Sequence, residues 1–186
     1  MSALPIYVDR DGVINENCRD YVRSLSQWIP VKGAFSALAA LSRAGHAIVV
    51  VTNQSAIARG YTTRENVEEI HDELLRLATD AGAVIQGIYY CPHHPDDGCN
   101  CRKPCTGMID AARRDLNLPD GGWIIGDAAS DMELGRRADL ETILVLTGRG
   151  AEQLQMIRDN RNKMPDLIVE NLGKATAYIL ATHSSM

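Results

Sequence analysis

Short runs of β-branched and apolar residues alternate with longer stretches of helical periodicity along the chain. The run at 47–53, AIVVVTN, is almost continuously apolar, which is typical of a strand buried on both faces of a sheet. The stretch 63–82 places its apolar residues on one helical face, with Thr63 as a candidate N-cap and Gly82 as a candidate stop. The pattern therefore predicts strands and helices in regular alternation.

This alternation repeats about six times. The predicted strands cover 6–9, 47–53, 87–91, 123–127, 142–147 and 166–170. The predicted helices cover 34–45, 63–82, 107–117, 130–138, 151–159 and 172–181. Such an order predicts an α/β fold, a Rossmann-like parallel sheet of about six strands with helices on both faces. Because we find no internal repeat or linker, we expect residues 1–186 to form a single domain.

Unusual polar residues stand at the ends of the predicted strands. The segment 9–12, Asp-Arg-Asp-Gly, follows the first strand, and Thr-Asn-Gln-Ser at 52–55 ends the second. Asp127 ends the fourth strand, with Asp131 one helical turn later, and Lys103 lies between the third strand and its helix. Each alone could be an N-cap or turn residue. Together they indicate a site, because ligands of open α/β sheets bind at the carboxyl ends of strands.

Carboxylates dominate this predicted site. Asp9 and Asp11, with one or two acids from another strand end, form a hard oxygen site suited to Mg²⁺. A carboxylate is also a competent nucleophile toward phosphorus and forms an aspartyl-phosphate. Phosphoryl transfer needs positive charge and donors around the phosphoryl oxygens, which Mg²⁺, Lys103, Thr52 and loop amides could supply. The residues therefore predict a phosphatase.

Composition and charge narrow the partners. Hydrophobic residues make up 45% and charged residues 23%, as in globular proteins, and the formal net charge is −5. That sign gives no general attraction to nucleic acid or to anionic membrane surfaces. No apolar run approaches the about 18 residues that span a bilayer, and we find no secretion leader. We therefore expect a soluble, cytoplasmic protein, a monomer with neither a nucleic-acid nor a membrane partner.

Four of the five cysteines lie close together. CPHHPDDGCNC at 91–101 contains Cys-x-His followed by Cys-x-Cys, and the odd total argues against a disulfide framework. Three thiolates and an imidazole give the closed Cys₃His coordination of structural zinc, with no open position for catalysis. The predicted ligands are Cys91, His93, Cys99 and Cys101. His94 and Cys105 are competing ligands, and inert thiols are the alternative.

Four of these sequence features together resemble the motifs of the haloacid dehalogenase (HAD) superfamily of phosphatases. They are DRDGV at 9–13, TNQ at 52–54, Lys103 and GDxxxD at 126–131, and they cover nearly the whole chain. Members of that superfamily usually gain selectivity from a cap domain inserted after the first or second motif. Here those intervals have room for a helix plus loops, so we expect a capless, open site with the zinc loop and segment 15–22 as its rim.

The resemblance implies roles for particular residues. Asp9 would be the nucleophile, and Asp11 the general acid/base that protonates the leaving alcohol and then activates water. Thr52 and Lys103 would hold the phosphoryl group. Magnesium would be bound by Asp9, Asp127 and the main-chain carbonyl of Asp11, with Asp131 standing behind them.

Two phosphatase subfamilies share the zinc loop. NQSAIARGY at 53–61, YYCPHHP at 89–95 and CRKPCTGM at 101–108 resemble the subfamily that removes the C7 phosphate of heptose 1,7-bisphosphate in bacterial heptose biosynthesis. That resemblance implies a phosphorylated sugar as substrate and Arg102 in its recognition. The resemblance also implies substrate contacts by Asn17, Asp20, Tyr21, Asn53, Gln54 and Ser55. Arg59 and Arg19 are further candidates, as cations at the rim that could bind a phosphate group.

Three alternatives stay open at this point. The other subfamily with a similar loop is histidinol-phosphate phosphatase. A zinc-stabilised binding module without activity is a different class, but such a relative is expected to lose a carboxylate or the lysine, and Asp9, Asp11, Lys103 and Asp127 are all present. A DNA 3′-phosphatase is disfavoured by the negative net charge and the absence of a basic, aromatic-rich run.

Overall fold

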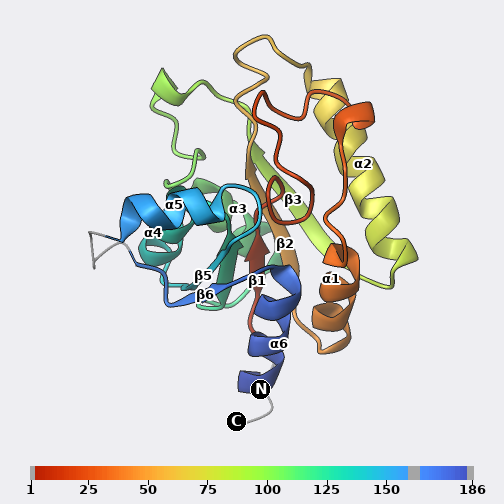
Figure 1. The fold of residues 1–186 in the computed structure, drawn as a ribbon, viewed down its shortest axis with the longest axis vertical. Helices are drawn as coiled ribbons and strands as arrows, with labels where there is room; N and C mark the ends of the chain where they lie inside the picture. The colour runs from red at the N-terminus through yellow and green to blue at the C-terminus, as the bar shows by residue number, and fades with distance from the viewer. Residues whose placement is uncertain (1–2, 159–163, 184–186) are drawn as a thin grey trace.

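A six-stranded sheet forms the centre of the protein, and every strand pair in it is parallel, in the order β3-β2-β1-β4-β5-β6 (Figure 1). The computed structural model describes residues 3–158 and 164–183. The strands are β1 (Ile6–Val8), β2 (Ile48–Asn53), β3 (Ile85–Cys91), β4 (Trp123–Gly126), β5 (Glu141–Val145) and β6 (Leu167–Val169). The parallel sheet of six strands is therefore confirmed.

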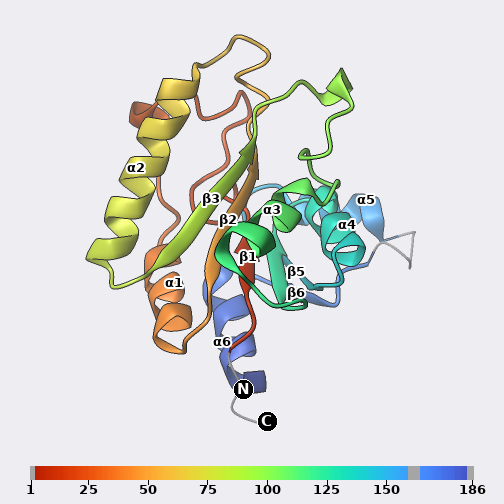
Figure 2. The same cartoon turned by 180° about the vertical axis from the view of Figure 1, so that it is seen from behind.

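In the part of the chain that the structure describes, six α-helices connect or follow these strands and lie on both sides of the sheet (Figures 1 and 2). They are α1 (Ala34–Arg43), α2 (Arg64–Asp80), α3 (Gly107–Leu116), α4 (Ala129–Arg137), α5 (Gly150–Ile157) and α6 (Leu172–His183). Two short 3₁₀ turns, η1 (Leu25–Gln27) and η2 (Pro95–Asp97), lie in the loops after β1 and β3. The end of the helix predicted to 159 lies outside the described residues.

Alternate residues of each strand enter two different cores. Ile6 and Val8 of β1 pack in the core that includes α1, α2 and α6, whereas Tyr7 between them packs in the core that includes α3 and α4. A smaller cluster joins α5 to α4 and β5. This two-sided burial explains why the strands read as continuous apolar runs, because both faces of a parallel sheet are covered.

Helix α2 begins and ends where the sequence predicts, at the N-cap Thr63 and before Gly82. The Thr63 side chain accepts a hydrogen bond from the Asn66 backbone N–H at 3.3 Å and so caps the helix. Gly82 follows the helix with a φ of +80°, a left-handed conformation that glycine adopts at little cost. Among the described residues, no helix is long and apolar enough to cross a membrane.

The order of the strands places a crevice at one edge of the sheet. Strand order runs one way from β1 to β3 and the other way from β4 to β6, so the chain diverges beyond the carboxyl ends of β1 and β4. The connections after β1 and β2 each contain one α-helix and loops, with η1 added in the first. The edge of the sheet is therefore left open rather than covered by an inserted domain.

Candidate functional site

The carboxyl ends of three strands bring the predicted motifs together. Val8 of β1 pairs in register with Val50 of β2 and with Ile125 of β4. The chain therefore leaves these neighbouring strands at the same edge of the sheet. Asp9 follows β1 directly, and Asp127 follows β4 directly. The parallel register thus explains why motifs more than a hundred positions apart in the sequence meet in one place.

Lys103 is a buried cation at the centre of the site. Its Nζ lies 2.8 Å from Asp9 Oδ1 and 2.7 Å from Asp131 Oδ1, and it donates to the Val51 carbonyl at 3.0 Å. The side chain is 2% exposed. Burial alone would lower the pKa of Lys103, but the charges of Asp131 and Asp9 outweigh it and raise the pKa above its usual value. Lys103 is therefore a fixed positive charge beside Asp9.

Three buried carboxylates surround this one cation. Asp9, Asp127 and Asp131 offer oxygens that all lie within 4.8 Å of one another. Burial, followed by the charges of Asp131 and Asp127, raises the pKa of Asp9 to about 7 against the opposing charge of Lys103. Burial and Asp131 likewise raise the pKa of Asp127 to about 6. The cluster therefore holds more negative charge than Lys103 can balance.

The donor set of this cluster fits a magnesium ion. Asp127 Oδ1 is buried and accepts no hydrogen bond from the described residues, although the Arg149 guanidinium lies 3.8 Å away. Both oxygens of Asp131 are engaged, one by Lys103 and the other by the Ala128 backbone N–H at 3.1 Å. Carboxylate oxygens are the ligands that Mg²⁺ prefers. An excess of buried carboxylate with an unsatisfied oxygen is therefore what such an ion would relieve.

Two glycines allow the backbone to approach Asp127 closely. A Cβ at Gly12 would lie 2.1 Å from Asp127 Oδ2, and a Cβ at Gly148 would lie 2.3 Å from the same atom. Both glycines have positive φ, +85° and +56°. The Arg149 backbone N–H then donates to Asp127 Oδ2 at 2.7 Å. This packing fixes the Asp127 carboxylate between two loops.

Asp11 points to a different set of partners. Its carboxylate accepts from Arg10 Nη2 at 3.0 Å at both oxygens, from Asn15 Nδ2 at 2.9 Å and from Gln54 Nε2 at 2.8 Å. Burial tends to raise the pKa of Asp11, but the Arg10 charge and these hydrogen bonds outweigh it and lower the pKa below its usual value. The Asp11 side chain is 24% exposed and also borders the cleft.

The residues at the end of β2 support their neighbours. Thr52 Oγ1 accepts from Gln54 Nε2 at 2.9 Å. Asn53 binds the backbone of Lys103 through both ends of its amide, with Oδ1 accepting from the Lys103 N–H at 3.0 Å and Nδ2 donating to its carbonyl at 3.3 Å. Asn53 therefore ties the loop that carries Lys103 to the sheet.

A cleft of about 840 Å³ opens over these groups. The predicted site residues that line it are Asp9, Asp11, Asn17, Tyr21, Thr52, Asn53, Gln54, Ser55, Arg102 and Lys103. Arg19 lines it as well, whereas Asp20 and Arg59 are not among the lining residues. Asp127 is buried and is not among the lining residues, but its carboxylate lies within 4.8 Å of that of Asp9, which lines the cleft.

Several lining residues were not identified from the sequence. Arg149 and Glu152 come from the loop and helix after β5, and Ser130 comes from the start of α4. The signal for Arg149 was available, because TGRG at 147–150 also follows a strand at this edge of the sheet. The buried side chain of Arg10, next to Asp11, was also missed.

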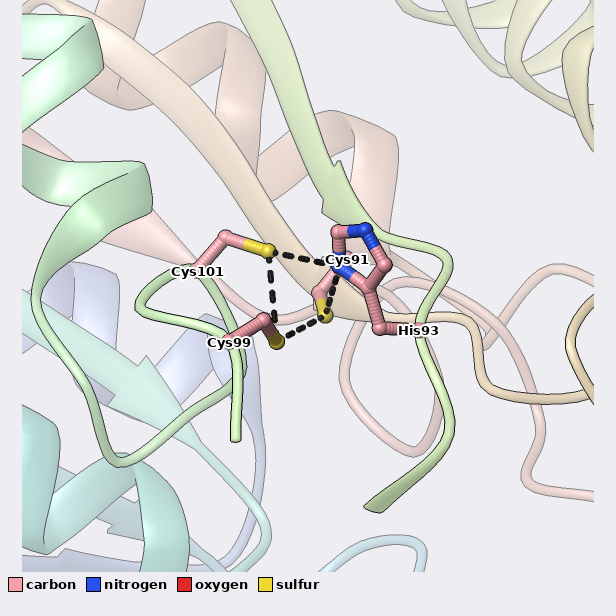
Figure 3. A group of neighbouring side chains, drawn as sticks. All are labelled: Cys91, His93, Cys99 and Cys101. Carbon is pink, nitrogen blue, oxygen red and sulfur yellow. Dashed lines mark hydrogen bonds between the residues drawn. The ribbon is translucent and has the colours of Figure 1, made fainter. Parts of the chain in front are cut away.

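The four predicted zinc ligands lie together (Figure 3). The Cys91 and Cys99 Sγ atoms are 3.5 Å apart, Cys99 and Cys101 Sγ are 3.6 Å apart, and His93 Nδ1 is 3.1 Å from Cys101 Sγ and 3.6 Å from Cys91 Sγ. Tetrahedral ligands bonded to one zinc lie about 3.3–3.8 Å apart. Three of the four distances lie in this range and the His93–Cys101 distance is slightly shorter, so the four groups are close enough to bind a single ion.

The competing ligands stand outside this group. His94 instead caps η2, where its Nδ1 accepts from the Asp96 N–H at 3.4 Å. Cys105 is not part of the four-residue cluster, and all five cysteines are free thiols. The close group therefore consists of the Cys-x-His and Cys-x-Cys pairs alone.

Comparisons with known proteins agree with this geometry. A family model described as HAD-hydrolase-like matches residues 100–175. A Pseudomonas aeruginosa protein named D-glycero-β-D-manno-heptose-1,7-bisphosphate 7-phosphatase is 43% identical, over 83% of this chain and 87% of its own length. A Chlorobaculum tepidum protein named D-glycero-D-manno-heptose-1,7-bisphosphate 7-phosphatase is 36% identical, over 99% of this chain and 98% of its own.

A solved structure of a protein with the same kind of name has a similar fold. The D,D-heptose 1,7-bisphosphate phosphatase of B. bronchiseptica, in complex with magnesium and phosphate, superposes with a TM-score of 0.88. It is 34% identical and covers 96% of this chain and 99% of its own. The fold similarity therefore extends over nearly the whole length of both chains.

The raised carboxyl pKa values predict when Mg²⁺ stabilises the protein. A carboxyl whose pKa is raised by folding stabilises the fold at low pH, and this contribution is lost as the pH rises through the folded pKa, here about 6 for Asp127 and about 7 for Asp9. Mg²⁺ binds these two carboxyl groups in their ionised form. The increase in Tm on adding Mg²⁺ should therefore be small near about pH 5 and develop through about pH 6–7, rather than near the ordinary carboxyl pKa.

The comparison with and without Mg²⁺ at each pH is essential to this measurement. Burial and Arg10 lower the pKa of His71 to about 3, so His71 gives a stability change of opposite sign that Mg²⁺ does not affect. Asp127→Asn is the control and should lose the Mg²⁺ response at every pH. A full response already present near about pH 5 would contradict the raised pKa values.

Proposed function

Because the chain belongs to the heptose-1,7-bisphosphate 7-phosphatases of the HAD-like hydrolases, we propose that it removes the C7 phosphate of D-glycero-D-manno-heptose 1,7-bisphosphate with Asp9 as nucleophile. The observation that carries the residue assignment is the buried Asp9–Lys103 ion pair at the floor of the cleft, next to the acid cluster. A nucleophile, a fixed cation and candidate metal ligands thus share one surface.

The backbone N–H of Arg10 and the Lys103 side chain orient Asp9 for attack. Asp9 Oδ1 accepts from the Arg10 N–H at 2.7 Å and lies 2.8 Å from Lys103 Nζ. With Oδ1 held, Oδ2 attacks phosphorus, so the Oδ2–P bond forms while the bond from phosphorus to the sugar oxygen breaks. Lys103 and the Thr52 hydroxyl hold the phosphoryl oxygens as charge develops on them.

Asp11 moves the proton in both steps. The negative charge of a bound phosphate group raises the pKa of a neighbouring carboxyl, which allows Asp11 to carry the proton that it gives to the leaving sugar oxygen. It then takes a proton from the water that attacks the aspartyl-phosphate, and the Asp9 carboxylate is restored. Bound Mg²⁺, held by Asp9, Asp127 and the Asp11 carbonyl, would supply positive charge to the phosphoryl oxygens.

Charge on the rim supports the bisphosphate over histidinol phosphate. The cleft is lined by Arg19, Arg102 and Arg149, and the buried Nη1 of Arg102 has no hydrogen-bond partner among the described residues. An arginine binds a phosphate through its planar fork. Histidinol phosphate presents an amine and an imidazole instead, which such a rim repels. The curated relatives favour the same choice.

The substrate and the nucleophile are tested together. We expect kcat/KM for heptose 1,7-bisphosphate to exceed that for histidinol phosphate by at least about tenfold, since one arginine–phosphate fork is worth about 1.5–3 kcal/mol. Asp9→Asn should abolish turnover of both, because an amide cannot form the acyl phosphate. Phosphate release is the measurement. Preference for histidinol phosphate would select the alternative, and a tenth of the activity kept by Asp9→Asn would exclude the covalent route.

Arg102 is proposed to recognise the phosphate that is not transferred. Arg102→Ala should lower kcat/KM for the bisphosphate by about 10- to 100-fold and that for p-nitrophenyl phosphate by much less, because only the bisphosphate has a second anion. Arg114→Ala, which removes an exposed charge on α3, is the control and should change neither. Equal losses on both substrates would mean that Arg102 acts on the transferred phosphate.

We also propose that the four-residue Cys/His cluster binds one structural zinc ion. Elemental analysis should find about one zinc per chain, lost in Cys99→Ser together with thermal stability, because a zinc clip replaces a hydrophobic core in this loop. The matched control is Cys105→Ser, which removes a thiol outside the cluster and should keep the metal. A zinc-free protein of equal Tm would refute this assignment.

A further inference from the structure

Arg10 has a buried guanidinium whose nitrogens contact Asp11 and His71. Its guanidinium is 0% exposed, and it contacts the Asp11 carboxylate through Nε at 3.3 Å and through Nη2 at 3.0 Å to each oxygen. This is a forked contact between a planar cation and a planar anion, which fixes orientation as well as distance. Arg10 therefore controls the direction of the Asp11 carboxylate.

His71 of α2 holds the other end of the guanidinium. His71 Nε2 lies 3.1 Å from Arg10 Nη1, and both side chains are buried. Arginine can only donate, so His71 Nε2 accepts and the imidazole is neutral. Burial and the Arg10 charge lower the pKa of His71 to about 3, in agreement with that state. The Tyr90 ring packs edge-on against His71 with centroids 5.3 Å apart and so limits its rotation.

These contacts form a continuous chain from α2 to the acid/base. His71 fixes Arg10, and Arg10 fixes Asp11, with Asn15 and Gln54 holding the same carboxylate from two other directions. The role of a neutral acceptor at His71 is geometric, because it adds no charge to the site. A proton donor must lie within hydrogen-bond reach of the leaving oxygen, and small misplacements reduce the rate strongly.

We propose that Arg10 and His71 are positioning residues for proton transfer by Asp11, with His71 aiming Arg10 and Arg10 aiming the Asp11 carboxylate at the leaving oxygen. This inference rests on the acid/base role of Asp11 in the proposed function. In the first step the Asp11 proton moves to the ester oxygen as its bond to phosphorus breaks. A misoriented Asp11 therefore lowers the rate of hydrolysis for esters whose leaving group needs this proton. The rate for esters whose leaving group does not need it stays nearly unchanged.

The dependence on the leaving group separates positioning from a structural role. p-Nitrophenolate leaves without a proton, phenolate benefits from one, and the alkoxide of a sugar phosphate requires one. Phenyl phosphate and p-nitrophenyl phosphate also have nearly the same shape, so their comparison isolates proton demand. The parameter to compare is kcat/KM, because it reports the steps through release of the alcohol and not the later attack of water.

His71→Leu removes the acceptor and keeps an apolar side chain. We expect kcat/KM to fall about 10- to 100-fold for a sugar phosphate, by an intermediate factor for phenyl phosphate, and less than about threefold for p-nitrophenyl phosphate. In His71→Gln the amide oxygen replaces Nε2 and should restore the wild-type pattern. His71→Asn is too short to do so and should behave like His71→Leu.

Two further variants keep the test decisive if His71→Leu does not fold. Arg10→Lys keeps the charge but loses the fork, and it should show the same graded loss. Leu74→Ala is the matched control: it removes buried side-chain volume from the same helix but takes no part in the hydrogen bonds that link His71 to Asp11, so any loss should be equal for all three esters.

The outcomes distinguish this inference from the proposed function. Equal losses on the three esters in His71→Leu and Arg10→Lys, or no rescue by His71→Gln, would overturn the positioning role. If wild-type protein does not hydrolyse heptose bisphosphate but hydrolyses other phosphate esters, the proposed substrate fails while the ester series still tests Arg10 and His71. A graded loss with rescue supports the positioning role in either case.

Discussion

Lys103 Nζ contacts Asp9, Asp131 and the Val51 carbonyl at 3.0 Å or less, and the Lys103 side chain is only 2% exposed where it lines the cleft. One buried cation faces three buried carboxylates, and a burial of that kind is costly unless each charge is paired. The rest of the site follows from this requirement. Asn53 fixes the Lys103 backbone, backbone N–H groups bind Asp131 and Asp127, and the remaining negative charge favours a divalent cation.

The two buried cations of the site act in different ways. Lys103 is a compact charge that bridges two acids, and its contacts depend on distance more than on direction. Arg10 is a planar fork, and its contacts to Asp11 and His71 depend on direction. Asp9, which an ion pair with Lys103 holds, and Asp11, which the directional contacts of Arg10 hold, can thus lie two residues apart in one loop. Burial and the charges of Asp131 and Asp127 raise the pKa of Asp9 against the charge of Lys103, whereas the Arg10 charge and hydrogen bonds outweigh burial and lower the pKa of Asp11.

The sequence was sufficient for the sheet and for the groups at its edge. Apolar runs identify strands buried on both faces, and parallel strands necessarily bring residues such as Asp9 and Asp127 to one edge. The positions of residues in long loops follow no regular pattern of this kind. Asp20 and Arg59 were therefore placed at the rim without a geometric basis and do not line the cleft. His71 was missed because a histidine on the buried face of α2 has the same pattern as a packing residue.

Gly12 and Gly148 press against Asp127 from two loops and leave no space for even a methyl group. The acid cluster at the floor of the cleft is consequently tightly packed, whereas the walls of the cleft include exposed loop side chains such as Asn17 and Arg19. Substitutions are therefore tolerated more readily at the wall residues than at the floor, both in evolution and in protein engineering. New ester substrates are accessible through changes to the wall residues, while the chemistry of phosphoryl transfer is inherited unchanged with the floor.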